Sequence, residues 1–186
     1  MEIGLTEKNK TDLIKLVKLT IANSLNIDSN IDTDELNFDD GIFREKFGAF
    51  VTLHKNGNLR GCIGYIEGIK PLKETIEDMA VSAAFSDPRF DPVSENEYDD
   101  IDVEISILTP ITDVKNVDEI EVGKDGLIIS HGFNRGLLLP QVATEQNWDR
   151  DTFLRHTCLK AGLPPDSWKN ENVKIEKFSA FVFGEN

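Results

Sequence analysis

Two stretches separated by an Asn-Gly pair constrain the fold of this chain more than any other feature. The run from Phe47 to Leu53 is apolar apart from Gly48 and Thr52, and Asn56-Gly57 follows it. Both positions of a two-residue hairpin turn need a positive φ, which asparagine and glycine tolerate best. The sequence therefore predicts an antiparallel hairpin whose second strand carries residues 59–64.

The second strand of this hairpin reads Leu-Arg-Gly-Cys-Ile-Gly, an unusual composition for a strand. Strand interiors favour β-branched and aromatic residues, so Gly61 and Gly64 indicate close approach by another backbone or by a ligand. We regard both glycines as candidate ligand-binding positions.

The turn also predicts the register of the two strands. A two-residue loop places Leu53 opposite Arg60 and Val51 opposite Cys62. We therefore expect Arg60 and Cys62 to be neighbours on one pleated face, with His54 on the other.

The chemistry of Cys62 depends on its surroundings, which the sequence leaves open. A nearby cation favours the thiolate, the nucleophilic form, whereas apolar burial raises the pKa of a thiol and leaves it inert. Cys62 is therefore either a packed, unreactive residue or a candidate catalytic residue facing a ligand.

The same hexapeptide resembles the signature of the AMMECR domain family, whose members are often named AmmeMemoRadiSam system protein A. Further segments resemble the family in its own order, from roughly residue 47 to residue 183; they are Ser86–Phe90, Val103–Pro110, Gly136–Ala143, Trp148, Phe153–Leu154, Cys158–Leu163 and Trp168. One departure is Asp125, where relatives often carry histidine, so no role of that histidine is transferred to this chain.

The resemblance implies a two-layer fold in which a larger subdomain contains both chain ends and a smaller one is inserted. It also implies partners, namely Memo-like proteins and radical S-adenosylmethionine proteins, rather than a particular reaction. The whole chain, residues 1–186, would then be one AMMECR-type domain made of two interlocked subdomains.

Hydrophobic periodicity supports an α+β fold with a mainly antiparallel sheet. Apolar residues recur at helical spacing in three segments, Thr6–Ser24, Leu72–Ala84 and Asp149–Lys160. Strand patterns occupy Val103–Ile107, Leu127–Ile129, Gly136–Leu139 and Val173–Phe183. These strands are joined by hairpins as well as helices, which is typical of antiparallel pairing.

Composition narrows the function classes. The formal net charge is −14, so we expect no general binding to nucleic acid, which needs clustered lysine and arginine. There are only two cysteines, no secretory pattern and no apolar run of about twenty residues, so we expect a cytoplasmic protein that does not span a membrane. The sequence contains neither of the metal-binding motifs His-Glu-x-x-His and Cys-x-x-Cys, and it has no Walker loop or dinucleotide-binding glycine motif. We therefore expect neither a metal nor another cofactor.

Three functions remain open from the sequence. In the first, a cleft beside residues 60–64 binds a small anionic ligand or a protein segment through Arg60, with Asp87, Arg89 and Gln141 as neighbours. In the second, Cys62 is the nucleophile of an enzyme, assisted by Arg60 and by an acid-base group such as His131 or Glu104. In the third, the hexapeptide only packs two subdomains of a scaffold together, with Asp87 and Arg89 forming a salt-bridged turn and Gln141 capping backbone groups.

Overall fold

The computed structural model describes residues 3–185, which form two compact units. The first unit comprises residues 3–108 and 181–185, and the second comprises residues 109–180. Helices are mixed with antiparallel strands, which confirms the predicted α+β class. Each unit has its own hydrophobic core.

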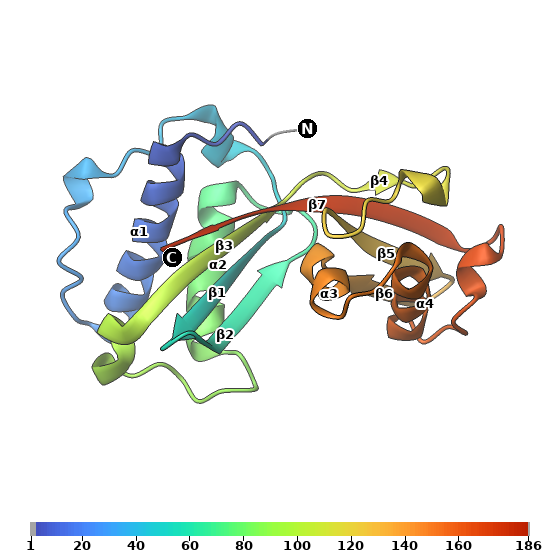
Figure 1. The fold of residues 1–186 in the computed structure, drawn as a ribbon. Coiled ribbons are helices and arrows are strands. Elements are labelled where there is room, and N and C mark those ends of the chain that lie inside the picture. The colour runs from blue at the N-terminus through green and yellow to red at the C-terminus, as the bar shows by residue number, and fades with distance from the viewer. Residues whose placement is uncertain (1–2, 186) are drawn as a thin grey trace. The chain divides into compact units, whose positions relative to one another are not determined.

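The sheet of the first unit is built around β1 (Ala49–Lys55). This strand pairs antiparallel with β2 (Asn58–Tyr65) on one side and with β3 (Ile101–Leu108) on the other, as Figure 1 shows. The final residues of β7 (Lys174–Gly184) follow β3, so β2 lies at the end of the strand order. The predicted hairpin is confirmed, because Lys55 faces Asn58 across a two-residue turn in which both φ angles are positive.

Two helices cover one face of this sheet. Helix α1 (Glu7–Leu25) begins at Thr6, whose side chain forms a capping box with Asn9, and α2 (Leu72–Phe85) begins after Pro71. The core lies between these helices and alternate strand residues such as Val51 and Leu53. Strand alternation therefore directs the residues between them, such as Thr52, to the opposite face.

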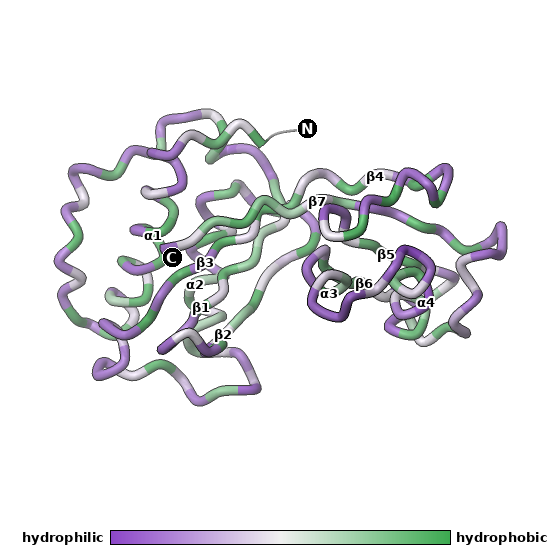
Figure 2. The backbone as a smooth tube through the Cα atoms, viewed as in Figure 1, coloured by the Kyte–Doolittle hydropathy of each residue, from purple (hydrophilic) through white to green (hydrophobic). Residues whose placement is uncertain are grey.

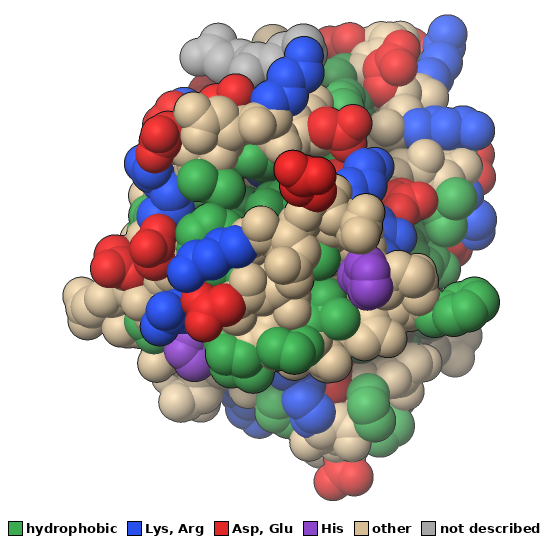
Figure 3. Space-filling model, turned by 90° about the vertical axis from the view of Figure 1, so that its right-hand side faces the viewer, with side chains coloured by type: hydrophobic (Ala, Val, Ile, Leu, Met, Phe, Trp, Pro, Cys, Tyr) green, Lys and Arg blue, Asp and Glu red, His purple; other side chains and the backbone are tan. Residues whose placement is uncertain are grey.

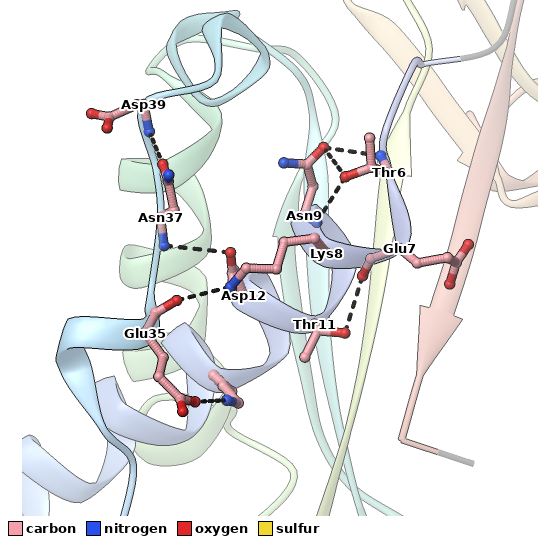
Figure 4. Close-up of polar contacts among 10 residues, drawn as sticks. Thr6, Glu7, Lys8, Asn9, Thr11, Asp12, Glu35, Asn37 and Asp39 are labelled. Carbon is pink, nitrogen blue, oxygen red and sulfur yellow. Dashed lines mark hydrogen bonds and ion pairs between the residues drawn. The ribbon is translucent and has the colours of Figure 1, made fainter.

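The acidic connector between α1 and β1 is tied to α1 by a buried carboxylate, as Figure 4 shows. Asp12 is fully buried, pairs with Lys8 at 2.7 Å and accepts a hydrogen bond from the backbone N–H of Asn37 at 3.4 Å. Lys8 also donates to the carbonyl oxygen of Glu35 at 2.8 Å. The connector contains two short 3-10 helices, η1 (Thr33–Glu35) and η2 (Gly41–Arg44), and Figure 2 shows its largely hydrophilic course.

The second unit packs helices on a smaller antiparallel sheet. Strand β7 lies between β4 (Thr112–Asp113) and β5 (Asp125–His131), and β6 (Asn134–Leu138) pairs with β5. The strand segments predicted at residues 127–129 and 136–139 are joined by a hairpin, in which His131 faces Asn134 across a two-residue turn. The core contains Leu127, Ile129 and Phe153.

The helices of the second unit agree with the sequence in one case and differ in another. Helix α4 (Arg150–Lys160) is the predicted one and is capped by the side chain of Asp149. Helix α3 (Pro140–Glu145) was not among the helices that the sequence predicted. Proline is favoured at the first helical position, so Pro140 starts this short helix. The remaining 3-10 helices are η3 (Glu95–Asp100), η4 (Val117–Glu119) and η5 (Ser167–Lys169).

Candidate functional site

A β-bulge changes the register of the hexapeptide strand. His54 faces Leu59 as expected, but Leu53 faces Gly61, so Arg60 is an extra residue without a partner in the ladder. Thr52 rather than Val51 then faces Cys62. The predicted register is wrong from Arg60 onwards.

The bulge also changes which side chains share a face with the thiol. Thr52 and His54 have the same parity on β1, so Cys62 lies on the face that carries His54, opposite the helices. Our placement of His54 on the other face was therefore wrong. A one-residue insertion has this effect because the side-chain period of a strand is two residues.

The free edge of β2 at Cys62 is covered by the turn that follows α2. The backbone N–H of Cys62 donates to Oδ2 of Asp87 at 2.9 Å, and Nη2 of Arg89 donates to the carbonyl oxygen of Cys62 at 3.2 Å. The carboxylate of Asp87 and the guanidinium of Arg89 thus pair with the backbone N–H and C=O of Cys62, which a neighbouring strand would otherwise bind. Exposed edge groups are templates for unwanted pairing, and this turn removes the template at Cys62.

The Asp87–Arg89 pair is held by several charge-assisted hydrogen bonds. Nε and Nη2 of Arg89 donate to the two carboxylate oxygens of Asp87 at 2.9 and 2.7 Å. The Asp87 side chain is 1% exposed, whereas that of Arg89 is 54% exposed. The Arg89 hydrogen bond, opposed by burial and aided by the Cys62 N–H, holds the pKa of Asp87 far below its ordinary value. The same hydrogen bond raises the pKa of Arg89, opposed by burial and aided by the charge of Asp87.

Arg60 pairs with a carboxylate that the sequence did not single out. Its Nε and Nη2 both donate to Glu97 at 3.1 Å, and Lys55 pairs with the same carboxylate at 3.0 Å. Hydrogen bonds from Arg60, opposed by burial and aided by Lys55, hold the pKa of Glu97 far below its usual range. Nη1 of Arg60 is buried and has no hydrogen-bond partner within residues 3–185.

The ring of Phe90 lies near both guanidinium groups. Its centroid is 5.9 Å from Cζ of Arg60 and 5.5 Å from Cζ of Arg89, distances at which cations are attracted to an aromatic ring. The guanidinium groups of Arg60 and Arg89, which are far apart in the sequence, therefore share one aromatic neighbour. From the sequence, Phe90 was noted only as the last residue of the family segment Ser86–Phe90, and Glu97 was not among the candidate residues.

The thiol of Cys62 belongs to a row of polar side chains across three strands. Thr52 Oγ1 donates a hydrogen bond to Cys62 Sγ at 3.2 Å, and Thr52 faces Glu104 on β3. Cys62 and Glu104 are half-buried, and Thr52 is 9% exposed. Arg60 and Cys62 have different partners, and the cation bonded to the backbone of Cys62 is Arg89.

Both glycines of the hexapeptide make room for neighbouring atoms of the protein itself. A Cβ on Gly61 would lie 2.2 Å from the carbonyl oxygen of Ala83 in α2, and one on Gly64 would lie 2.3 Å from the ring of Phe50. The close approach that the sequence predicted is thus made by a helix backbone at Gly61 and by an aromatic ring at Gly64.

The remaining candidates lie in the second unit. Gln141 is the second residue of α3, where its carbonyl oxygen accepts from the Thr144 hydroxyl, and His131 ends β5. Asp125 is 4% exposed and accepts hydrogen bonds from Lys177 and Ser179. These hydrogen bonds join Asp125 on β5 to β7 within the second unit.

The described part of the chain offers neither a metal centre nor a membrane-spanning helix. Residues 3–185 contain no group of three or more His, Cys, Asp or Glu side chains arranged to hold a metal ion. Within the same range, no helix combines the length and apolar character needed to cross a membrane.

Comparison with known proteins identifies relatives along nearly the whole chain. The AMMECR1 family model matches residues 14–183. A protein of Methanothermobacter thermautotrophicus is 48% identical over 94% of this chain and 93% of its own length. A protein of Methanocaldococcus jannaschii is 53% identical over 77% of this chain and 76% of its own length. The crystal structure of an uncharacterised protein from Pyrococcus horikoshii has a TM-score of 0.79 and 41% identity, covering 94% of this chain and 90% of that one.

Proposed function

Because this chain belongs to the AMMECR1 family, we propose that it is an accessory binding protein that holds a small anionic ligand beside strand β2. The observation that carries this proposal is the unpartnered Nη1 of Arg60. Two cations, Arg60 and Lys55, also share the single carboxylate of Glu97. A ligand carboxylate or phosphate would supply both a partner for Nη1 and the balancing charge.

Arg89 provides a second cation for the same ligand. It is anchored by the buried Asp87, so its exposed guanidinium is held in one orientation without further ordering cost. Cys62 and Phe90 would line the site between the two arginines, while Gly61 and Gly64 allow the close packing that positions the strand.

An anion titration tests this function. We expect inorganic phosphate or citrate to raise the melting temperature in a concentration-dependent way and to perturb the backbone NMR signals of residues 60–62 and 87–90. The paired variant Arg60→Met/Glu97→Gln removes both charges and should abolish the effect without leaving a buried carboxylate unpaired. Arg44→Gln is the matched control, because Arg44 is exposed and lies outside the site.

Equal binding by the wild-type protein and the paired variant would contradict the proposal, as would perturbations confined to other residues. Failure of both anions to bind the wild-type protein at millimolar concentration would also count against it.

We further propose that the protein works in the cytoplasm with a Memo-like protein and a radical S-adenosylmethionine protein. The support is the family resemblance, and the free state of Cys62 and Cys158 agrees with a reducing compartment. Mixing the three purified proteins at micromolar concentration should give a complex by size-exclusion chromatography. Separate elution of all three would remove this part of the proposal.

A cysteine-dependent enzyme is the second candidate function, favoured by the hydrogen bond from Thr52 to Cys62 Sγ. A hydroxyl donor and a nearby arginine both favour a thiolate. Iodoacetamide should then label Cys62 faster at neutral pH in the wild-type protein than in Thr52→Val. Equal labelling rates in the two proteins argue against catalysis by Cys62. If Cys62→Ala lowers only stability and leaves anion binding intact, the hexapeptide has a scaffolding role.

A further inference from the structure

The second unit contains a pocket of about 580 Å³ that plays no part in the proposed function. One wall is His131 at the end of β5, and the rest comes from the segment 163–173, which joins α4 to β7. Its lining is mixed, with Leu163, Pro164 and Val173 as the apolar part and Ser167, Lys169, Asn170, Glu171 and Asn172 as further polar groups. The volume is in the range of small-ligand sites.

The segment 163–173 satisfies its own backbone through successive tight turns. Ser167 N–H donates to the Pro164 carbonyl, Asn170 N–H to that of Ser167, and Val173 N–H to that of Asn170. The side chains along these turns are therefore not needed to hold the backbone. Figure 3 views the side of the molecule on which this segment lies in Figure 1, and charged, hydrophobic and histidine side chains are intermingled there.

Four polar side chains of the lining are available to a ligand. Those of His131, Asn170, Glu171 and Asn172 make no hydrogen bond or ion pair with any residue from 3 to 185. Lys169 differs, because it pairs with Asp166 at 3.1 Å and lies over the ring of Trp168. The charge that lacks a protein partner in the pocket is therefore the carboxylate of Glu171.

These groups match the chemistry of a peptide amino terminus. A carboxylate binds an ammonium group, and each asparagine amide offers both a donor and an acceptor for a peptide bond. The apolar side chains offer contact for a hydrophobic first residue. We propose that this pocket binds the free amino terminus of a peptide whose first residue is apolar.

Two dipeptide probes that differ only in charge test this assignment. Leucylglycinamide carries the α-ammonium group, and N-acetyl-leucylglycinamide lacks it. We expect the first to perturb the NMR signals of residues 163–173 and to bind about three- to tenfold more tightly than the second. Glu171→Gln should remove this preference, and binding of the acetylated probe should not change.

Glu145→Gln is the control, because Glu145 is an exposed carboxylate of the same unit outside the pocket lining. This variant should keep the wild-type preference. Equal affinity for the two probes in the wild-type protein, an unchanged preference in Glu171→Gln, or signals that move only outside residues 163–173 would each overturn the assignment. A melting temperature measured for every variant separates loss of binding from loss of fold. None of these results depends on anion binding in the first unit.

Discussion

At the scale of single residues, Asp87 links the end of a helix to the edge of a sheet. It is buried, accepts the N–H of Cys62 and binds Arg89 through both oxygens. A salt-bridged turn was one of the alternatives that the sequence left open, and the structure shows this ion pair and places the turn over the edge of β2. The contact with β2 joins residues 25 positions apart, so it follows from the packing of α2 rather than from local sequence.

The contribution of the Asp87 charge to the free energy of unfolding should depend on pH. We expect Asp87→Asn to lower the free energy of unfolding by about 2–4 kcal/mol at pH 7, because the charge that binds Arg89 is lost. The native state depresses the pKa of Asp87, so its stabilisation is complete above the unfolded value of about 4 and declines as pH falls below it.

Urea unfolding of both proteins at neutral and acidic pH checks this prediction. The difference between wild type and variant should shrink on acidification, and Asp91→Asn, at an exposed position, should show little difference at either pH. A difference that stays constant down to pH 3 would contradict the assigned role.

Gly61 and Gly41 form a second residue-scale comparison. A Cβ at Gly61 would meet the Ala83 carbonyl oxygen at 2.2 Å, whereas one at Gly41 would meet nothing within 4 Å. We expect Gly61→Ala to cost about 2–3 kcal/mol, because the backbone of α2 must move, and Gly41→Ala to be nearly neutral. Thermal unfolding of the two variants measures the difference in stability. Equal melting temperatures would show that α2 can move away from residue 61 without loss of stability.

At the scale of elements, the bulge in β2 decides which side chains meet. The Asn56-Gly57 turn was predictable because its chemistry is local. The bulge at Arg60 was not, because the side chain that makes an extra residue favourable, Glu97, lies 37 positions away. This one insertion replaced the predicted Arg60–Cys62 neighbourhood with the observed Thr52–Cys62 contact.

The connector before β1 offers a test at the same scale. Asp12 holds it to α1 through Lys8 and the backbone of Asn37, so Asp12→Asn should loosen residues 31–40. We expect hydrogen exchange in that segment to accelerate, with a local loss of about 1–3 kcal/mol. Asp39→Asn should have little effect, because the side chain of Asp39 points away from these contacts in Figure 4. Equal acceleration in both variants would remove the role of Asp12.

At the scale of the whole molecule, the two separate hydrophobic cores predict that each unit can be destabilised independently of the other. Phe153 is fully buried in the core of the second unit and Leu13 in that of the first. Phe153→Ala should cost about 3–5 kcal/mol and Leu13→Ala about 2–5 kcal/mol. Hydrogen exchange should show the first loss mainly in residues 109–180 and the second mainly in residues 3–108. Uniform loss of protection in both variants would indicate one cooperative unit.

The sequence by itself determined the elements whose signals are local. These are the capped helix after Thr6, the helix after Pro71, the alternating strand of residues 103–107 and the two-residue turn at Asn56-Gly57. Their causes are hydrophobic period, capping and backbone preference, all of which act over a few residues. The family resemblance was also readable from the sequence, because its segments follow one another in the family's own order.

Only the tertiary structure decided the partners of the functional candidates. Glu97 for Arg60, the backbone of Cys62 for Asp87 and Arg89, and Thr52 for the thiol are chosen by packing between distant segments. Side-chain pairing depends on register and on helix position, and a shift of one residue reverses the face of a strand. The local pattern therefore singled out the candidate residues, and long-range packing set their geometry.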